Sequence, residues 1–282
     1  MCRSGECRVK RRSNRLTPLP LLLLWNGATH IPLSPPARTF HPHTPPNSDV
    51  IVGPGNMWVT AAKSLVAGVC AIDMLAGPSE VLVIADGNAN PKVIAADLLA
   101  QAEHDTEARP ILVCTDEKLI TDVNAELQQQ LAVLPTAPVA REAVKKGFAV
   151  LTSNVDEAIA ISDRVGPEHL EIQTADHDAV AKRCSNYGGL FVGEIAAEVL
   201  GDYGAGPNHV LPTGGTSKYS GGLSVFNFIR IRTWMRIDDA AASQGLVEDS
   251  VQLARLEGLE GHARAAECRL VDEPASKKAR VG

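Results

Sequence analysis

The sequence predicts an α/β protein with a mostly parallel β-sheet, flanking helices and a helical C-terminal segment. Two observations carry this prediction. From residue 49 onward, short apolar runs alternate with segments of helical periodicity. One of these runs, Val-Leu-Val-Ile-Ala at residues 81–85, is continuously apolar, as expected for a strand that is buried on both faces.

The elements expected after this strand follow in β-α-β order. Pro91 stands where a first helical residue is expected, and the helix that it opens places Leu98 and Ala102 on one apolar face. Asn154 is expected to cap a later helix. Further strands are expected at residues 111–115, 148–152, 169–174 and 190–192, with a helix between the first two that reaches about residue 134. This order is typical of a parallel sheet.

Three parts are expected along the chain: an extension at 1–48, an α/β core at 49–237, and a helical segment with a polar tail at 238–282. Eight of the 18 prolines lie within the extension, which we expect to be extended or disordered. Its Lys10-Arg11-Arg12 run precedes a short apolar stretch, which resembles an organelle-targeting signal. A non-functional extension is the other interpretation.

Composition narrows the class of protein. Hydrophobic residues make up 45% and charged residues 21% of the chain, which is ordinary for a soluble globular protein. The net charge is −6, yet residues 1–48 are strongly basic, so the core is acidic and is not expected to bind nucleic acid. No apolar run approaches the ~20 residues that span a membrane. The six cysteines form no C-x-x-C pair, which favours reduced thiols and a cytoplasmic location.

Two pairs of residues could carry chemistry. Gln101 and His104 lie three residues apart on an expected helix, so both project from one face. An imidazole beside an oxygen donor can hold a divalent metal such as zinc, although an exposed polar helix end gives the same pattern. Glu168 and His169 follow a Gly-Pro turn. This pair could activate water or shuttle protons, although a structural ion pair uses the same residues.

A glycine-rich loop at 201–209 holds one carboxylate, Asp202, and one imidazole, His209. Its glycines permit close approach of a ligand, but an ordinary surface loop remains open as an interpretation. His177, between two aspartates, is expected to be exposed. No G-x-G-x-x-G motif occurs, so the residues alone do not predict a dinucleotide site.

Six segments together resemble the histidinol dehydrogenase family, in the order in which that family carries them. They are GPGN (53–56), DMLAGPSE (73–80), QAEH (101–104), VGPEHLE (165–171), GDYGAGPNH (201–209) and EGLEGH (257–262). Each segment is weakly specific by itself, whereas six in order over most of the chain are very specific.

The resemblance implies an enzyme with incomplete Rossmann-like domains that uses zinc and NAD. Such an enzyme oxidises L-histidinol through the aldehyde to L-histidine, in histidine biosynthesis. It also implies a homodimer with shared active sites, in which the helical segment at 238–282 contacts the partner subunit.

The resemblance further implies roles for individual residues. Gln101, His104 and Asp202 would be zinc ligands, and the partner subunit's His262 would complete the zinc site. Glu168 would be the general base and His169 the proton shuttle. Contacts with substrate would come from Ser79, His209, Glu257 and His262, and a contact with NAD from Asn56.

One departure from the family bears on activity. The family carries a long segment before the position of Gly53, including much of one nucleotide-binding domain, whereas the proline-rich stretch stands there in this chain. The resemblance therefore predicts an incomplete NAD site and a poor dehydrogenase. Two alternatives are a zinc-binding truncated remnant with little or no activity, and a zinc hydrolase in which Glu168 activates water without a nicotinamide.

Overall fold

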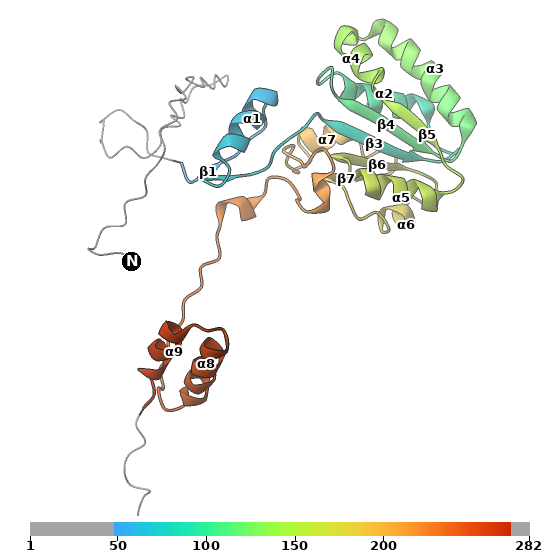
Figure 1. Ribbon diagram of the computed structural model, residues 1–282. Coiled ribbons are helices and arrows are strands. Elements are labelled where there is room, and N and C mark those ends of the chain that lie inside the picture. Colours follow the sequence, from blue (N-terminus) through green and yellow to red (C-terminus); the bar gives the residue numbers. More distant parts are fainter. Residues whose placement is uncertain (1–47, 272–282) are drawn as a thin grey trace, which may run out of the picture. The chain divides into compact units, whose positions relative to one another are not determined.

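The computed structural model describes residues 48–271, which form two compact units divided between Ile229 and Arg230 (Figure 1). The expected proline-rich extension, apart from its last residue, and the expected polar tail lie outside the described residues. Among the described helices, none combines the length and the apolar character of a membrane-spanning segment.

The larger unit is organised by a five-stranded sheet in which every neighbouring pair of strands is parallel, in the order β5-β4-β3-β6-β7. Its strands are β3 (Glu80–Ala85), β4 (Arg109–Cys114), β5 (Phe148–Leu151), β6 (His169–Gln173) and β7 (Gly189–Val192). This arrangement confirms the predicted fold class.

Helices cover both faces of this sheet, as Figure 1 shows. On one face lie α2 (Pro91–Ala102), α3 (Glu117–Val133) and α4 (Ala137–Val144); on the other lie α5 (Val155–Val165) and α6 (His177–Ala181). Val81 and Val83 pack with α2, whereas Leu82 and Ile84 pack with α5. Because both faces are covered, β3 is apolar at every position after Glu80.

Local signals fix where the helices begin and end. The side chain of Asn154 accepts a backbone N–H bond at the start of α5, which confirms the predicted cap. At the start of α2, Pro91 is the first helical residue, as predicted, and the side chain of Asn90 caps the helix. Gly166 ends α5 with φ 63°, and a Cβ there would lie 2.7 Å from Ser217 Oγ. Glycine is therefore required at this turn, which leads directly into β6.

A small substructure precedes the main sheet. It consists of β1 (Val50–Ile51), α1 (Met57–Val66) and β2 (Ala71–Ile72), with β1 and β2 parallel. Lys63 Nζ lies 2.7 Å from Asp73 Oδ1, and both side chains are buried. Asp73 also accepts the N–H of Gly53 at 2.7 Å. The hydrogen bond from Gly53 to Asp73 therefore joins the first two family-like segments to each other.

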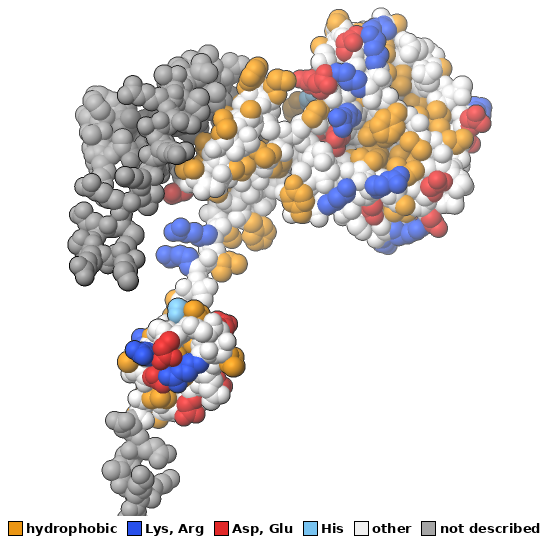
Figure 2. All heavy atoms as spheres, viewed as in Figure 1, with side chains coloured by type: hydrophobic (Ala, Val, Ile, Leu, Met, Phe, Trp, Pro, Cys, Tyr) orange, Lys and Arg blue, Asp and Glu red, His pale blue; other side chains and the backbone are white. Residues whose placement is uncertain are grey.

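The remaining elements complete the two units. Within the larger unit they are α7 (Glu198–Asp202) and the short 3₁₀ turns Thr216–Lys218 and Val225–Phe228. The smaller unit contains the helical pair α8 (Gln244–Leu256) and α9 (Glu260–Glu267). Figure 2 shows acidic and basic side chains interspersed over this pair, and Arg255 forms ion pairs with Glu260 and Glu267.

Candidate functional site

The amino ends of β3 and β6 bring two of the expected catalytic residues together. The strands are adjacent, and Val81 pairs with His169 in the parallel register. Glu168, immediately before β6, accepts a hydrogen bond at Oε2 from the backbone N–H of Glu80, at 3.0 Å. Both Glu168 and His169 are buried. The sheet itself therefore fixes the position of the carboxylate and the imidazole.

A cavity of about 280 Å³ opens at this amino edge. Its lining consists of Pro54, Ser79, Gln101, His104, Glu168, His169, Asp202, Tyr203 and His209. Seven of the residues expected from the sequence are among them. Residues that are far apart in the chain thus meet in one place.

The directions of α2 and α7 explain why Gln101, His104 and Asp202 lie at this cavity. The helix α2 follows β3 and runs back across the sheet, so that Gln101 in its last turn returns to the amino edge. His104 lies just beyond the end of the helix and is exposed. Asp202, half-buried, is the last residue of α7. Two elements thus supply an amide, an imidazole and a carboxylate to one cavity.

The Gln101 amide lies among hydrogen-bond acceptors, which sets its orientation. With its nitrogen toward them, it donates to His169 Nδ1 at 2.9 Å, to the Glu80 carbonyl at 3.1 Å and to Glu198 Oε2 at 3.2 Å. The opposite orientation would set the amide oxygen against a carbonyl and a carboxylate. The amide oxygen is therefore turned away from these acceptors.

Burial gives the two catalytic candidates unusual acidities. It raises the pKa of Glu168 to about 8, and the nearby carboxylates of Glu80 and Asp202 act in the same direction. Burial lowers the pKa of His169 to about 4, so the imidazole is neutral near pH 7. His169 Nε2 is buried and has no hydrogen-bond partner among the described residues. It is therefore available to a group that enters the site.

Further carboxylates, which the sequence analysis did not single out, lie beneath the cavity. Burial and like charges raise the pKa of Glu171 to about 8 and that of Glu198 to about 9. Glu171 Oε1 accepts the N–H of Glu198 at 3.1 Å. The sequence does carry a signal for Glu171: polar residues alternate with apolar ones along β6, whereas β3 is apolar at every position after Glu80. For Glu198 no such signal is present.

Three expected site residues are not among the residues that line the cavity. The side-chain oxygen of Asn56 accepts the N–H groups of Trp58 and Val59 and thereby caps α1. Glu257 and His262 belong to the smaller unit, where both are exposed.

The imidazole, carboxylate and amide groups at the cavity are of types that can bind a zinc ion. No group of three or more His, Cys, Asp or Glu suited to a metal occurs among the described residues. A zinc ion held by this chain alone would therefore need the amide oxygen of Gln101 in addition to His104 and Asp202. Imidazole and carboxylate are common zinc ligands, and three protein ligands leave a coordination position open.

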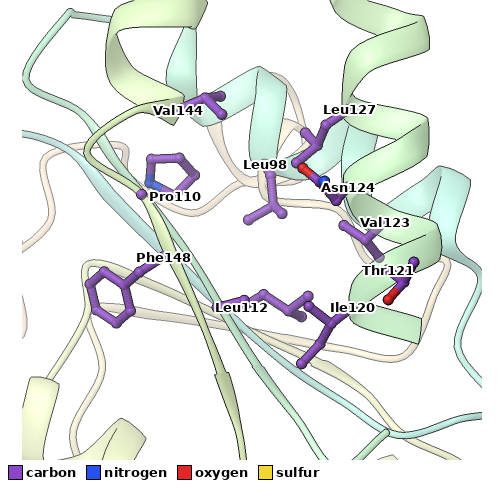
Figure 3. Close-up of a pocket in the computed structure, with 12 residues that line it drawn as sticks. Leu98, Pro110, Leu112, Ile120, Thr121, Val123, Asn124, Leu127, Val144 and Phe148 are labelled. Atoms are coloured by element: carbon purple, nitrogen blue, oxygen red, sulfur yellow. The ribbon is translucent and has the colours of Figure 1, made fainter. Parts of the chain in front are cut away.

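A second hollow, of about 350 Å³, lies between α3, α4 and the edge of the sheet (Figure 3). Leu98 and Leu127 point into it, and none of the described residues that line it is titratable. It therefore lacks the groups that acid–base catalysis requires.

Removing one buried carboxylate should change how stability depends on pH. The folded chain keeps the Glu198 proton up to about pH 9, because the folded pKa is about 9, whereas the unfolded chain releases it above about 4.5. Stability from this group is therefore present at low pH and is lost as the pH rises through this window. The Glu198→Gln variant lacks this titrating group, so its stability should not decrease with pH for this reason.

Thermal midpoints are to be measured in EDTA at pH 5.5 and at pH 8.5. Between these two pH values, we expect the midpoint of the wild type to decrease by at least ~2–4 °C more than the midpoint of Glu198→Gln, which corresponds to ~1 kcal/mol. Circular dichroism melts measure this difference. Glu142→Gln, at an exposed site, is the control and should behave like the wild type. Equal pH dependence of Glu198→Gln and the wild type would contradict the burial of this acid.

Comparison with known proteins identifies the family. The family model of histidinol dehydrogenase matches residues 37–270. The histidinol dehydrogenase of Thermus thermophilus is 48% identical over 224 residues, which cover 79% of this chain and 54% of that protein. The Lactococcus lactis histidinol dehydrogenase is 46% identical over 225 residues, with coverage of 79% and 52%.

A solved structure agrees with these matches. The crystal structure of histidinol dehydrogenase from Elizabethkingia anophelis superposes with a TM-score of 0.75 at 36% identity, over 80% of this chain and 52% of that one. The chain spans about half the length of the curated relatives that it matches. The chain belongs to the histidinol dehydrogenase family.

Proposed function

We propose that this chain acts in the NAD-dependent oxidation of L-histidinol, through the aldehyde, to L-histidine. The observation that carries the proposal is the single cavity at the amino edge of the sheet. Seven residues that the family resemblance assigns to zinc, substrate or proton transfer line this cavity, although they are spread from Ser79 to His209.

Zinc would be held by Gln101, His104 and Asp202, with the partner subunit's His262 as a further ligand. When bound, the zinc would hold the imidazole and the amine of the substrate. The donor set described above is consistent with this role.

Glu168 and His169 would move protons. A carboxyl group with a pKa of about 8 exchanges its proton near neutral pH, which suits a general base that acts on water. The buried, unpartnered Nε2 of His169 would face the reacting oxygen of the substrate and carry its proton. Burial of both side chains would exclude bulk water from the proton transfers.

NAD, when bound, would accept the hydride in each oxidation. Among the described residues, Asn56 is the position that matches a family NAD contact. Its side-chain oxygen is occupied at the start of α1, so its contact with NAD would be donation from the amide nitrogen. Ser79 and His209 in the cavity, and Glu257, would contact the substrate.

The proposal extends to a homodimer in the cytoplasm. Exposed leucines on α8, including Leu253 and Leu256, offer apolar surface for a partner subunit. The cysteines at 70, 114, 184 and 268 are all free thiols, which agrees with a reducing compartment.

Zinc binding should depend on His104. Removing a residue that only hydrogen-bonds to a metal ligand typically lowers metal affinity by ~10–100-fold. Removing a ligand itself should therefore lower zinc affinity by at least ~100-fold. We expect His104→Ala to lose most of the zinc that the purified full-length chain carries, as measured by elemental analysis. His177→Ala is the matched control, because His177 lies beyond the opposite edge of the sheet, and it should keep its zinc. Equal zinc in both variants would refute the ligand assignment.

Turnover should depend on Glu168. The Glu168→Gln side chain keeps the shape but removes the base, which should lower the rate by ~10²–10⁴-fold. Formation of NADH from histidinol, with zinc and saturating NAD, measures the whole reaction. The oxidation of the aldehyde, which consumes water, should suffer more than the oxidation of the alcohol. Glu142→Gln, an exposed acid, serves as the control. A wild-type chain that binds zinc but forms no NADH would instead favour the inactive remnant.

A further inference from the structure

Two loops of the small substructure reach the catalytic cavity from outside the main sheet. The loop at residues 53–56, which precedes α1, contributes Pro54 to the lining of the cavity. The loop at residues 73–79, which follows β2, ends at Ser79, another lining residue. The shape of this part of the cavity therefore depends on how the two loops are held.

Apolar packing within this substructure is sparse. Among the described residues from 49 to 78, the buried apolar side chains are those of Ala62, Val66 and Met74. Trp58, on the same helix as the first two, is instead 71% exposed. So few apolar contacts fix the loops poorly, and polar contacts must contribute to their positions.

Lys63, in the last turn of α1, supplies these polar contacts together with Asp73. Its ammonium group donates to Asp73 Oδ1 at 2.7 Å and to the carbonyl oxygen of Gly53. Asp73 in turn accepts the N–H of Gly53 at Oδ2 and that of Met74 at Oδ1, each at 2.7 Å. The ion pair therefore binds both backbone polar groups of Gly53 and links the start of one loop to the start of the other.

Gly53 is the residue through which this ion pair sets the path of the first loop. Its φ is 124°, a backbone conformation that favours glycine, and Pro54 follows it directly. Because proline fixes its own φ, the orientation of the Gly53 peptide determines where Pro54 lies. The side chains of Lys63 and Asp73 are only 7% and 0% exposed, so water competes little for these hydrogen bonds.

We propose that Lys63 is a positioning residue, which holds the two loops at the catalytic cavity through its bonds to Asp73 and Gly53. The inference rests on the proposed function, because the ligand that it serves is histidinol, which would contact Ser79 at the end of the second loop. A buried ion pair adds little net stability compared with apolar residues of similar volume, since removing two charges from water is costly. Its contribution here is the fixed geometry of the loops.

The first test compares amide hydrogen exchange in the full-length chain and two variants, without zinc or substrate. Lys63→Met removes the charge but keeps most of the side-chain length, and Lys63→Met/Asp73→Asn also removes the carboxylate that would otherwise be buried alone. Because a hydrogen bond to a charged group is lost, the Gly53 amide should exchange at least ~tenfold faster in both variants, while the amides of β3 keep their rates. Lys118→Met, which removes an exposed ion pair with Asp122, is the control. Equal exchange of the Gly53 amide in the variants and the control would overturn the proposal.

The second test measures histidinol binding to the zinc-loaded chain by calorimetry, at a temperature at which circular dichroism shows every variant to be folded. Loops that must first be ordered should weaken histidinol binding at least ~tenfold in both Lys63 variants. Zinc content should stay at the wild-type level, because the expected zinc ligands lie on other elements. A lower melting temperature with unchanged histidinol affinity would show a purely structural role and overturn the proposal. A wild type that binds no histidinol would refute the proposed function instead, and hydrogen exchange would then decide alone whether Lys63 holds the loops.

Discussion

The parallel register between β3 and β6 is the constraint on which the candidate site depends. It places His169 beside Val81 and sets Glu168 against the backbone of Glu80. A shift of the register by one residue would turn the side chain of His169 to the opposite face of the sheet, away from Gln101. The glycine turn at Gly166 leads the chain into β6, and this register is held by the alternation of polar and apolar residues along β6, whose Leu170 and Ile172 pack in the same core as Leu82 and Ile84 of β3.

The same register builds a polar ladder through the middle of the protein. His169, Glu171 and Gln173 follow one another at every second position of β6, while Asp97 and Gln101 are spaced by four residues on α2. The spacing of the polar residues on α2 matches their spacing on β6, because Gln101 forms a hydrogen bond with His169 and Asp97 forms one with Gln173. Hydrogen-bonded side chains therefore extend from the candidate site at the amino edge of the sheet to Gln173 at its carboxyl edge.

Such a ladder is costly for stability. Burial raises the pKa of Asp97, Glu171 and Glu198. Because the pKa of Glu171 rises to about 8 and that of Glu198 to about 9, these two groups keep protons that an unfolded chain would release at neutral pH. Proteins retain strained or poorly solvated groups mainly where function needs them. The position of the ladder directly beneath the cavity agrees with a supporting role for these acids.

Much of this arrangement could be predicted from the sequence, and the rest could not for identifiable reasons. The apolar run of β3, Pro91 at the start of α2 and the cap at Asn154 are local signals, and each was confirmed. The short helix α4 was not predicted, because its eight residues are too few to establish a periodicity and include a proline. Glu198 carries no local signal at all, since its burial arises from contacts with residues distant in the chain.

The convergence of the site residues could be predicted only by resemblance. Spacing predicted that Gln101 and His104 lie on one helix, whereas α2 ends at Ala102 and His104 lies just beyond it. Spacing does not bring Asp202 or Glu168 to them; the parallel sheet and the return of α2 do so. His177 shows the converse. Its flanking aspartates indicated exposure, whereas its bond to the Thr174 carbonyl draws it inward.

The most direct test of this account is the location of zinc in crystals of the full-length chain. Anomalous difference maps at the zinc absorption edge locate the ion without assumptions about ligands. The account predicts one peak in the amino-edge cavity, within ~2.0–2.2 Å of His104 nitrogen and Asp202 and Gln101 oxygens. A peak that lies outside this cavity, or a cavity that stays empty at saturating zinc, would contradict it.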